Sequence, residues 1–207
     1  RLERSLSQEK ILRSMIRERQ LAAFPSVVVA ADYVAGIEAL VQCQGLGSLR
    51  PNVVLLGCPL AVERMGVFGN LLRNLQSLGR SAVVLRRTDE PTDDWAAPAG
   101  PIDVWWRGNQ NGELMLLLAH LLAQNQRWRS RPIRLLRMIE NEAGRDEVLN
   151  HLEGLIDNAR IVATPHVVVS ENAVAAIQAT SRSAAIVFMG MAIPEEGEGE
   201  EFHKRMT

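Results

Sequence analysis

The strongest constraint on the fold is a repeated alternation between short β-branched runs and longer segments of helical periodicity. Continuous apolar runs are typical of strands buried on both faces, and intervening helices are typical of a parallel sheet. The sequence predicts strands at residues 27–31, 52–57, 81–87, 102–106, 133–139, 160–169 and 184–191. It predicts helices at residues 2–23, 32–43, 66–79, 112–126, 145–158 and 171–181. We therefore expect an α/β fold with a mostly parallel sheet and helices on both faces.

A break in this alternation predicts two lobes. Residues 88–101 contain three prolines, four acidic residues and little periodicity. Pro-rich polar stretches of this kind are typical of connections between compact parts. The predicted organisation is a first α/β lobe, a linker, a second α/β lobe and an acidic tail or loop, at residues 1–90, 91–100, 101–194 and 195–207.

Composition limits the classes of partner. The chain has 207 residues, 47% of them hydrophobic, which suffices for a real core. Its net charge of −1 gives no global sign of a nucleic-acid partner or an anionic membrane surface. The longest apolar stretch, residues 113–123, is interrupted by His120 and is shorter than the ~20 residues that a bilayer requires. The fragment is therefore not expected to span a membrane.

The two cysteines and the first residue indicate the cellular compartment and the extent of the chain. Cys43 and Cys58 each lie in or beside an apolar segment, which predicts buried thiols in a reducing compartment. The chain opens without an initiator methionine, so we interpret it as a piece of a longer protein.

Gly45 and Gly47 raise the question of a phosphate-binding loop. Such loops place glycines after a strand and before a helix N-terminus. Here the glycines follow a predicted helix and precede a predicted strand, which Pro51 introduces. We expect Gly45 to close the helix in the left-handed conformation and Gly47 to free the turn. A helix-to-strand connector is therefore favoured over a phosphate cradle.

Residues at the carboxyl ends of the predicted strands are the candidates for ligand contacts, because ligands of open α/β sheets bind there. Asp32 and Arg87 lie at such ends and could contact a small anion or a ribose. The alternative is that both are solvated loop charges.

The sequence shows no assembled catalytic or metal site. The four histidines, which lie on different predicted elements without metal-ligand spacing, are His120, His151, His166 and His203. A G-x-S-x-G hydrolase elbow is absent. Trp105 and Trp106 are adjacent on a strand, so they are expected to point to opposite faces and to pack under separate helices. We predict that the chain has no catalytic residues and does not turn over ATP or simple esters.

Two stretches carry a resemblance to a known family. QGLGSLRPNVVLLGCP resembles the G-L-G-x-x-(K/R)-P-N-x-x-x-x-G-(W/F) signature in the cytosolic C-terminal domain of cation-chloride cotransporters. PIDVWWRGNQNGELMLLLAHLLAQNQRWRSRPIRL is similar to the family's I-D-V-W-W strand and the leucine-rich helix that follows it. The matching positions, whose implied role is structural, are Gly45, Gly47, Arg50, Pro51, Asn52, Gly57, Asp103, Trp105 and Trp106. The chain departs from the pattern at Cys58, where an aromatic residue is usual, and at Val53, where threonine is usual.

The resemblance implies a regulatory rather than an enzymatic role. In the family this domain has two lobes similar to universal stress proteins, lies below its own transmembrane transporter domain, dimerises and modulates transport. Some members hold adenine nucleotide there, which makes adenine nucleotide the candidate cofactor. The expected place is the cytoplasmic face of the cell membrane. The short second lobe suggests a prokaryotic relative, and the transported ion and any control by kinases stay open.

Three functions therefore stay open at the level of sequence. They are a regulatory and dimerisation domain of a membrane transporter of the amino acid-polyamine-cation type, a free-standing nucleotide sensor similar to universal stress proteins, and an α/β enzyme completed by residues outside the fragment. The helix at 113–123 is apolar on more than one face, so a second surface is expected to cover the face turned away from the sheet. The candidates are the first lobe or the opening helix of the same chain, or a second copy in a homodimer, which is the arrangement we expect.

Overall fold

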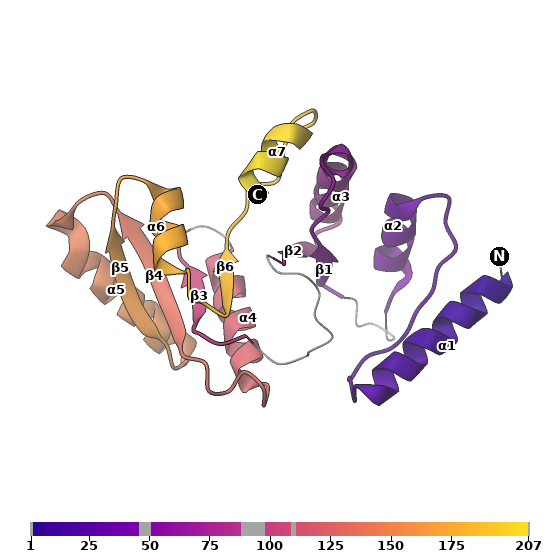
Figure 1. The fold of residues 1–207 in the computed structure, drawn as a ribbon, viewed down its shortest axis with the longest axis horizontal. Coiled ribbons are helices and arrows are strands. Elements are labelled where there is room, and N and C mark those ends of the chain that lie inside the picture. The colour runs from indigo at the N-terminus through magenta and orange to yellow at the C-terminus, as the bar shows by residue number, and fades with distance from the viewer. Residues whose placement is uncertain (1, 46–50, 88–97, 109–110, 207) are drawn as a thin grey trace. The chain divides into compact units, whose positions relative to one another are not determined.

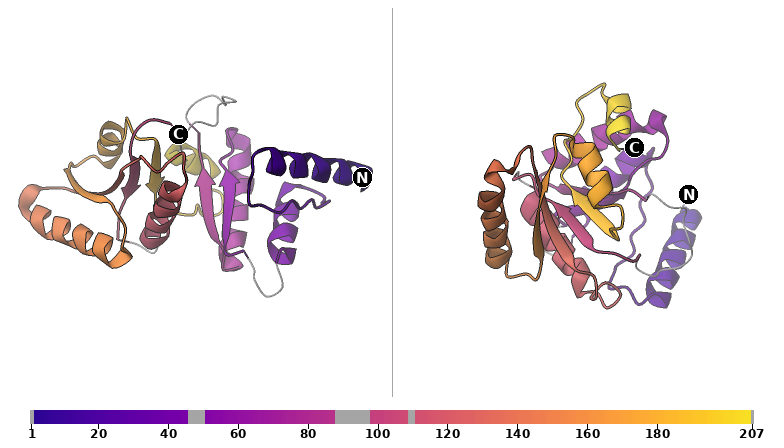
Figure 2. Two further views of the ribbon diagram at one scale, coloured as in Figure 1. Left: turned by 90° about the horizontal axis from the view of Figure 1, so that it is seen from below. Right: turned by 60° about the vertical axis from the view of Figure 1, so that its left-hand side comes forward.

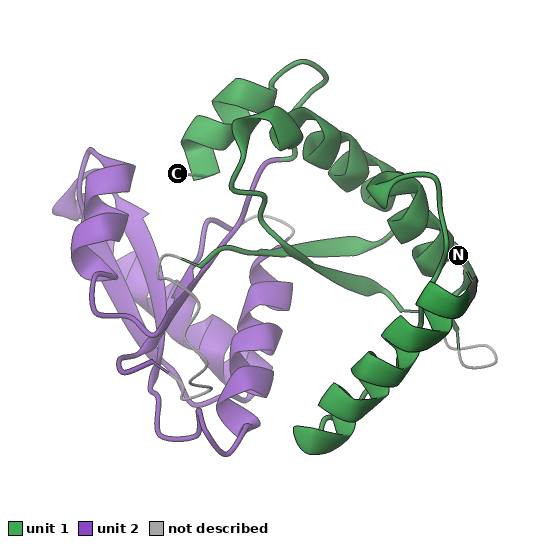
Figure 3. Cartoon of the chain, turned by 45° about the vertical axis from the view of Figure 1, so that its right-hand side comes forward, with its two compact units in different colours: residues 1–90, 193–207 green, residues 91–192 purple. Residues whose placement is uncertain are grey.

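The chain folds into two compact units, each with its own parallel sheet (Figure 3). The computed structural model describes residues 2–45, 51–87, 98–108 and 111–206. Unit 1 comprises residues 1–90 and 193–207, and unit 2 comprises residues 91–192. Because residues 193–207 return to unit 1, the chain passes between the units twice.

Unit 1 is built on a two-stranded sheet and the helix α3 (Figure 1). Its elements are α1 (Leu2–Glu18), α2 (Tyr33–Cys43), β1 (Val53–Gly57), the 3-10 helix η1 (Val62–Arg64), α3 (Met65–Ser77), β2 (Ser81–Leu85) and α7 (Gly199–Met206). The two strands are parallel, with Val53 opposite Ser81 and Gly57 opposite Leu85. The core residues of α3 recur at helical spacing and are Met65, Phe68, Leu71, Leu72 and Leu75. Figure 2 shows α3 alongside the sheet.

The end of α3 follows its sequence signal. Gly79 has φ +66°, and its N–H donates to the carbonyl of Gln76 at 2.9 Å. The N–H of Arg80 donates to the carbonyl of Leu75, also at 2.9 Å. A left-handed glycine with these two bonds closes a helix, as predicted for this position.

The strand predicted at residues 27–31 is wrong. Residues 21–30 have no regular structure, and the side chains of Val28 and Val29 are 38% and 54% exposed. A Cβ built on Gly36 of α2 would lie 3.5 Å from the Cβ of Ala30, so this run packs on α2. β-branched residues favour extended backbone, but a strand also needs a neighbour for its N–H and C=O groups.

The acidic tail or loop expected at 195–207 contains a helix instead. In α7 the first turn carries Glu200 and Glu201 and the last turn carries basic residues, which suits the helix dipole. Phe202 is 1% exposed and stacks on Phe68 of α3, with ring centroids 6.5 Å apart. The sequence did not predict this helix, because most of its residues are charged and only Phe202 packs against the core.

Unit 2 is a four-stranded sheet with helices on both faces. Its elements are β3 (Ile102–Trp105), α4 (Gly112–Gln124), β4 (Ile133–Ile139), the 3-10 helix η2 (Glu142–Gly144), α5 (Arg145–Ala159), β5 (Thr164–Val169), α6 (Ala173–Thr180) and β6 (Ile186–Met189). The strands are all parallel, in the order β5-β4-β3-β6. This confirms the predicted α/β class with parallel sheets.

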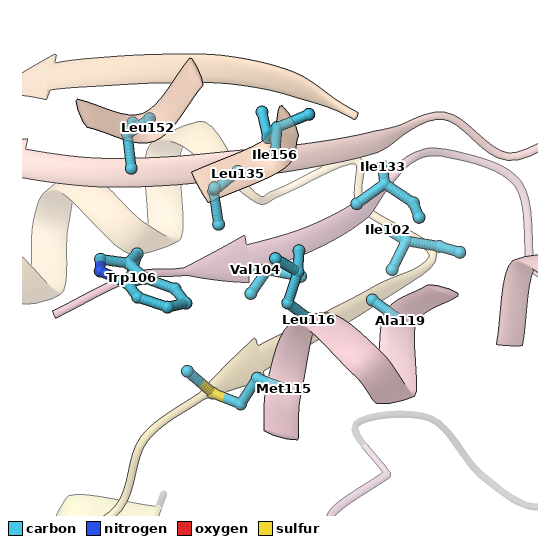
Figure 4. Close-up of a cluster of buried hydrophobic side chains, with 10 residues drawn as sticks. All are labelled: Ile102, Val104, Trp106, Met115, Leu116, Ala119, Ile133, Leu135, Leu152 and Ile156. Carbon is cyan, nitrogen blue, oxygen red and sulfur yellow. The ribbon is translucent and has the colours of Figure 1, made fainter. Parts of the chain in front are cut away.

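The main core of unit 2 lies on one face of this sheet (Figure 4). Ile102 and Val104 of β3 alternate toward that face, as do Ile133 and Leu135 of β4. Figure 4 shows them between side chains of α4 and α5, which are Met115, Leu116, Ala119, Leu152 and Ile156. The intervening residues of β3 point to the other face, where α6 ends. The sheet therefore places Asp103 and Trp105 against α6 and Trp106 against α4.

Candidate functional site

Asp103 is the centre of a buried polar cluster in unit 2. Its side chain is fully buried, and its carboxylate accepts two hydrogen bonds from Arg134, from Nε at 2.7 Å and from Nη2 at 2.6 Å. The two residues face each other because β3 and β4 pair in that register. The Ser181 hydroxyl donates to the second carboxylate oxygen at 2.6 Å.

The cluster extends to the end of α6. The indole Nε1 of Trp105 donates to the Ser181 hydroxyl at 3.0 Å, and Arg134 Nη2 also donates to the carbonyl of Thr180 at 3.1 Å. A buried carboxylate is tolerable when it is paired and hydrogen-bonded on both oxygens, as it is here. Asp103 and Trp105 therefore hold the C-terminal end of α6 against the sheet.

Trp106 fills the opposite face and constrains the start of α4. Its side chain is 7% exposed. A Cβ on Gly112, the first residue of α4, would lie 2.5 Å from the Trp106 ring, so only glycine fits there. The indole Nε1 has no hydrogen-bond partner among the described residues. The two tryptophans thus lie on opposite faces, as their adjacency predicts.

Asp32 caps a helix. Its carboxylate accepts a hydrogen bond from the N–H of Ala35 at 2.9 Å, and its own backbone is extended, with φ −145° and ψ 178°. This is the usual role of an aspartate that precedes a helix. Arg87 follows β2, a different element of unit 1, next to residues 88–97, which lie outside the described residues.

The glycine-rich connector is described only in part. Helix α2 ends at Cys43, and its C-cap residue Gln44 has extended backbone, with φ −73° and ψ 126°. The left-handed conformation of Gly45 stays a prediction. Gly47 and Arg50 lie outside the described residues. Pro51 is exposed, and the carbonyl of Asn52 accepts from the N–H of Ser81 at 2.9 Å, which begins the pairing of β1 with β2. Gly57 ends β1 with open space around its Cα.

The carboxyl ends of β1 and β2 bring Cys58 close to Arg86. The N–H of Cys58 donates to the carbonyl of Leu85 at 2.8 Å. Burial raises the pKa of the Cys58 thiol, and the charge of Arg86 acts in the opposite direction. A thiol with a raised pKa is a poor nucleophile at neutral pH. Cys43, which was expected to be buried, is exposed at the end of α2.

A small pocket in unit 1 was not foreseen from the sequence. It has a volume of about 150 Å³ and lies between α3 and the segment that leads into α7. Arg73 lines it, but its guanidinium already donates to the carbonyl of Pro194 at 2.6 Å and to Asn70. Sites for drug-sized ligands are roughly 300–1,000 Å³, so this pocket is too small for an adenine nucleotide. The segment that leads into α7 approaches α3 closely at Gly66 and Gly69, which are one turn apart. These two glycines are the sequence signal that could have indicated the contact.

The described residues contain neither a metal-binding cluster nor a membrane-spanning helix. Among the described residues, no three histidine, cysteine or acidic side chains gather in a way that could hold a metal ion. No helix in the described part of the chain combines the length and the apolar character needed to cross a membrane.

Comparisons with known proteins point to one family. The model of Solute carrier family 12 matches residues 2–60. Cation-chloride cotransporter 1 of Arabidopsis thaliana is 26% identical over 140 residues, which cover 65% of this chain and 14% of that protein. Cation-chloride cotransporter 2 of Oryza sativa subsp. japonica is 25% identical over 158 residues, which cover 73% of this chain and 16% of that protein.

The fold has a solved counterpart. A crystal structure described as the cytoplasmic domain of a prokaryotic cation chloride cotransporter matches with a TM-score of 0.66 at 18% sequence identity. The match covers 96% of this chain and 75% of that one. The chain therefore spans about a sixth or less of the curated relatives' length and most of this single solved domain.

Proposed function

We propose that this chain, a relative of the cation-chloride cotransporters, is the cytosolic regulatory and dimerisation domain of a membrane secondary transporter. The observation that carries the proposal is the likeness of nearly the whole chain to a domain described as the cytoplasmic part of such a transporter. The transporter would be of the amino acid-polyamine-cation type. The domain would lie at the cytoplasmic face of the membrane, continuous with the transmembrane part of the same protein.

The side-chain geometry supports a role without catalysis. The buried carboxylate of Asp103 is saturated by Arg134 and Ser181, and Asp32 is engaged as a helix cap. The relatives are named as cotransporters and not as enzymes. A domain of this kind acts through its surfaces and its attachment rather than through a reacting group.

Helix α4 supports the dimerisation part of the proposal. One side of it is buried against the sheet through Met115, Leu116 and Ala119. On another side Leu117 and Leu121, one helical turn apart, are 53% and 55% exposed. With the partly buried Leu114 and Leu118 they form a continuous apolar row, here called the α4 stripe. A second copy of the chain, related by a twofold axis, would cover this stripe on both molecules.

The experiment that tests the proposal uses the natural reading frame. It should encode, on the same polypeptide, a series of apolar spans of ~20 residues each. Reconstituted in vesicles, the complete protein should carry cations with chloride, and removal of residues 1–207 should change the flux rate while leaving transport measurable. A reading frame without apolar spans would overturn the proposal.

The alternative is a free-standing nucleotide sensor similar to universal stress proteins. It requires a nucleotide site within this chain. Titration calorimetry of the purified chain with ATP separates the two, because a sensor should bind nucleotide and its reading frame should encode no membrane span.

A further inference from the structure

The two edges of the unit 2 sheet differ strongly in charge. Because the four strands are parallel, the loops that precede them share one edge, here called the amino edge. Its described residues are 98–101, 125–132, 160–163 and 181–185. They include no acidic residue and five arginines, which are Arg127, Arg129, Arg131, Arg160 and Arg182. Residues 88–97, which precede them in the chain before β3, lie outside the described residues and carry Asp89, Glu90, Asp93 and Asp94.

The opposite edge has the reverse character. The described loop residues that follow the strands include Glu140, Glu142 and Glu171 against a single basic residue, Arg107. The whole chain has a net charge of −1, so its composition does not account for an arginine-rich edge. Among the described residues, the separation results from parallel pairing, which brings the loops of each edge together.

Three of these arginines are exposed and available. Arg129, Arg160 and Arg182 are exposed, and none forms an ion pair with a described carboxylate. They lie on three different loops, which lead into β4, β5 and β6. The nearest acidic residue in sequence is Asp157, in the last turn of α5.

Helix capping explains only part of this arrangement. Arg160 and Arg182 follow the ends of α5 and α6, where a cation is favoured by the helix dipole. Arg160 does so in the left-handed region, with φ 52°, a conformation that glycine or asparagine adopts at lower cost. Arg129 lies beyond the last turn of α4, where the dipole has no effect. Helix capping therefore does not account for the whole set, which is exposed and positioned to contact an external anion.

An apolar side chain projects from the same edge. Val162, in the loop between α5 and β5, is 92% exposed. Trp128, between Arg127 and Arg129, packs its ring on the fringe of the unit 2 core and so orients that loop. Guanidinium groups bind phosphate oxygens in a bidentate manner, and an aliphatic side chain beside them is suited to the interface between headgroups and acyl chains.

We propose that the amino edge of unit 2 binds an anionic phospholipid surface. Arg129, Arg160 and Arg182 contact headgroup phosphates, and Val162, beside the β5 end of this row, enters the layer between headgroups and acyl chains. An acidic protein segment would satisfy the arginines, whereas a membrane would satisfy them and also take up the protruding valine in its interfacial layer. The proposal takes from the proposed function only the presence of a membrane nearby, and vesicle binding by the isolated chain is measurable whether or not that function holds.

Vesicle co-sedimentation of the 207-residue chain tests the proposal. The chain should sediment with phosphatidylcholine vesicles that contain about one-third phosphatidylserine and not with pure phosphatidylcholine, and added salt should release it. Removing one arginine should weaken partitioning about five-fold, and the triple variant Arg129→Gln, Arg160→Asn, Arg182→Gln by on the order of 100-fold. Asparagine is chosen at position 160 because it tolerates positive φ.

The matched control removes the same charge elsewhere. Arg4→Gln, Arg17→Gln, Arg107→Gln alters three exposed arginines away from the amino edge and should retain most of the binding. Val162→Ser should weaken binding at unchanged charge. Circular dichroism and thermal midpoints establish that every variant is folded.

Three outcomes would overturn the proposal, and a fourth separates it from the proposed function. If the two triple variants lost vesicle binding equally, binding would depend on overall charge and not on the amino edge. Release of the chain by inorganic phosphate at constant ionic strength would assign the edge to free phosphate. Binding to polyglutamate without binding to vesicles would replace the membrane by an acidic protein. Vesicle binding by a chain whose reading frame lacks membrane spans would leave this inference standing while the proposed function fails.

Discussion

At the scale of single residues, Asp103 is the described charged side chain whose burial is most complete. It is a fully buried carboxylate whose charge is balanced by Arg134, a side chain that is itself 22% exposed. Such a pair adds little net stability, since both groups lose water, but removing one partner leaves the other unbalanced. Its evident contribution is to specify where α6 lies on the sheet.

Asp103→Asn should therefore destabilise unit 2 by about 3 kcal/mol, since Arg134 loses its counter-charge in a mostly buried position. Urea unfolding measures the change. The matched control is Glu142→Gln, which breaks the exposed pair with Arg145 and should cost under about 1 kcal/mol. Equal effects from the two substitutions would contradict a structural role for Asp103.

Two glycines should respond to alanine with opposite signs. Gly79 has φ +66°, so Gly79→Ala should destabilise unit 1 by about 1 kcal/mol through backbone strain. Gly154 lies within α5 with open space around it, so Gly154→Ala should stabilise unit 2 by about 0.5–1 kcal/mol. Denaturation midpoints of the two variants give the signs, and a common sign would refute this assignment.

At the scale of elements, α7 is the part of unit 1 that depends most on a distant contact. It follows the whole of unit 2 in the chain yet packs against α3. A Cβ on Gly69 would lie 2.9 Å from Cγ of Pro194, and a Cβ on Gly199 would lie 3.0 Å from the backbone nitrogen of Gly66. Close approach of the two segments therefore requires glycine on both sides.

Phe202→Ala should destabilise unit 1 by about 3–4 kcal/mol, because it removes a large buried ring that stacks on Phe68. It should also make the segment around Glu198 more susceptible to limited proteolysis. Phe24→Ala, at a side chain that is 82% exposed, is the control and should change stability by under about 0.5 kcal/mol. A null effect of Phe202→Ala would mean that α7 is not anchored by this ring.

At the scale of the whole molecule, two crossings of the chain connect the units, one near residue 91 and one near residue 192. The α4 stripe belongs to unit 2, and it is the apolar row that a second copy would cover. In an intact transporter the membrane part would hold two copies close together, so the isolated chain needs only modest affinity.

The purified chain should therefore show a monomer–dimer equilibrium with a Kd in the micromolar range, about −8 kcal/mol at 1 M standard state. Sedimentation equilibrium over a wide concentration range measures it. The double variant Leu117→Gln, Leu121→Gln should shift the chain to monomer without lowering its thermal midpoint. Val174→Gln, at a side chain on α6 that is 65% exposed, is the matched control and should leave the dimer intact. A wild-type chain that is monomeric at several hundred micromolar, about 100 times that Kd, would exclude the dimer.

The sequence by itself determined the features that depend on neighbouring residues. Continuous apolar runs and helical spacing predicted each described strand and α-helix of unit 2, though not the 3-10 helix η2, and the position of Gly79 predicted the end of α3. Adjacency alone placed Trp105 and Trp106 on opposite faces. These outcomes are local because backbone periodicity decides which side chains share a face.

Only the tertiary structure decided the features that join distant residues. Asp103 meets Arg134 and Ser181 from positions 31 and 78 residues away, and residues 27–31 lack a strand because no neighbouring strand pairs with them. The helix at 199–206 forms where composition indicated a loop, because one buried phenylalanine outweighs acidic neighbours. The arginine-rich amino edge is likewise invisible in a linear chain of net charge −1, since parallel pairing alone brings its loops together. Such contacts depend on which surfaces meet, and no local pattern in the sequence records that.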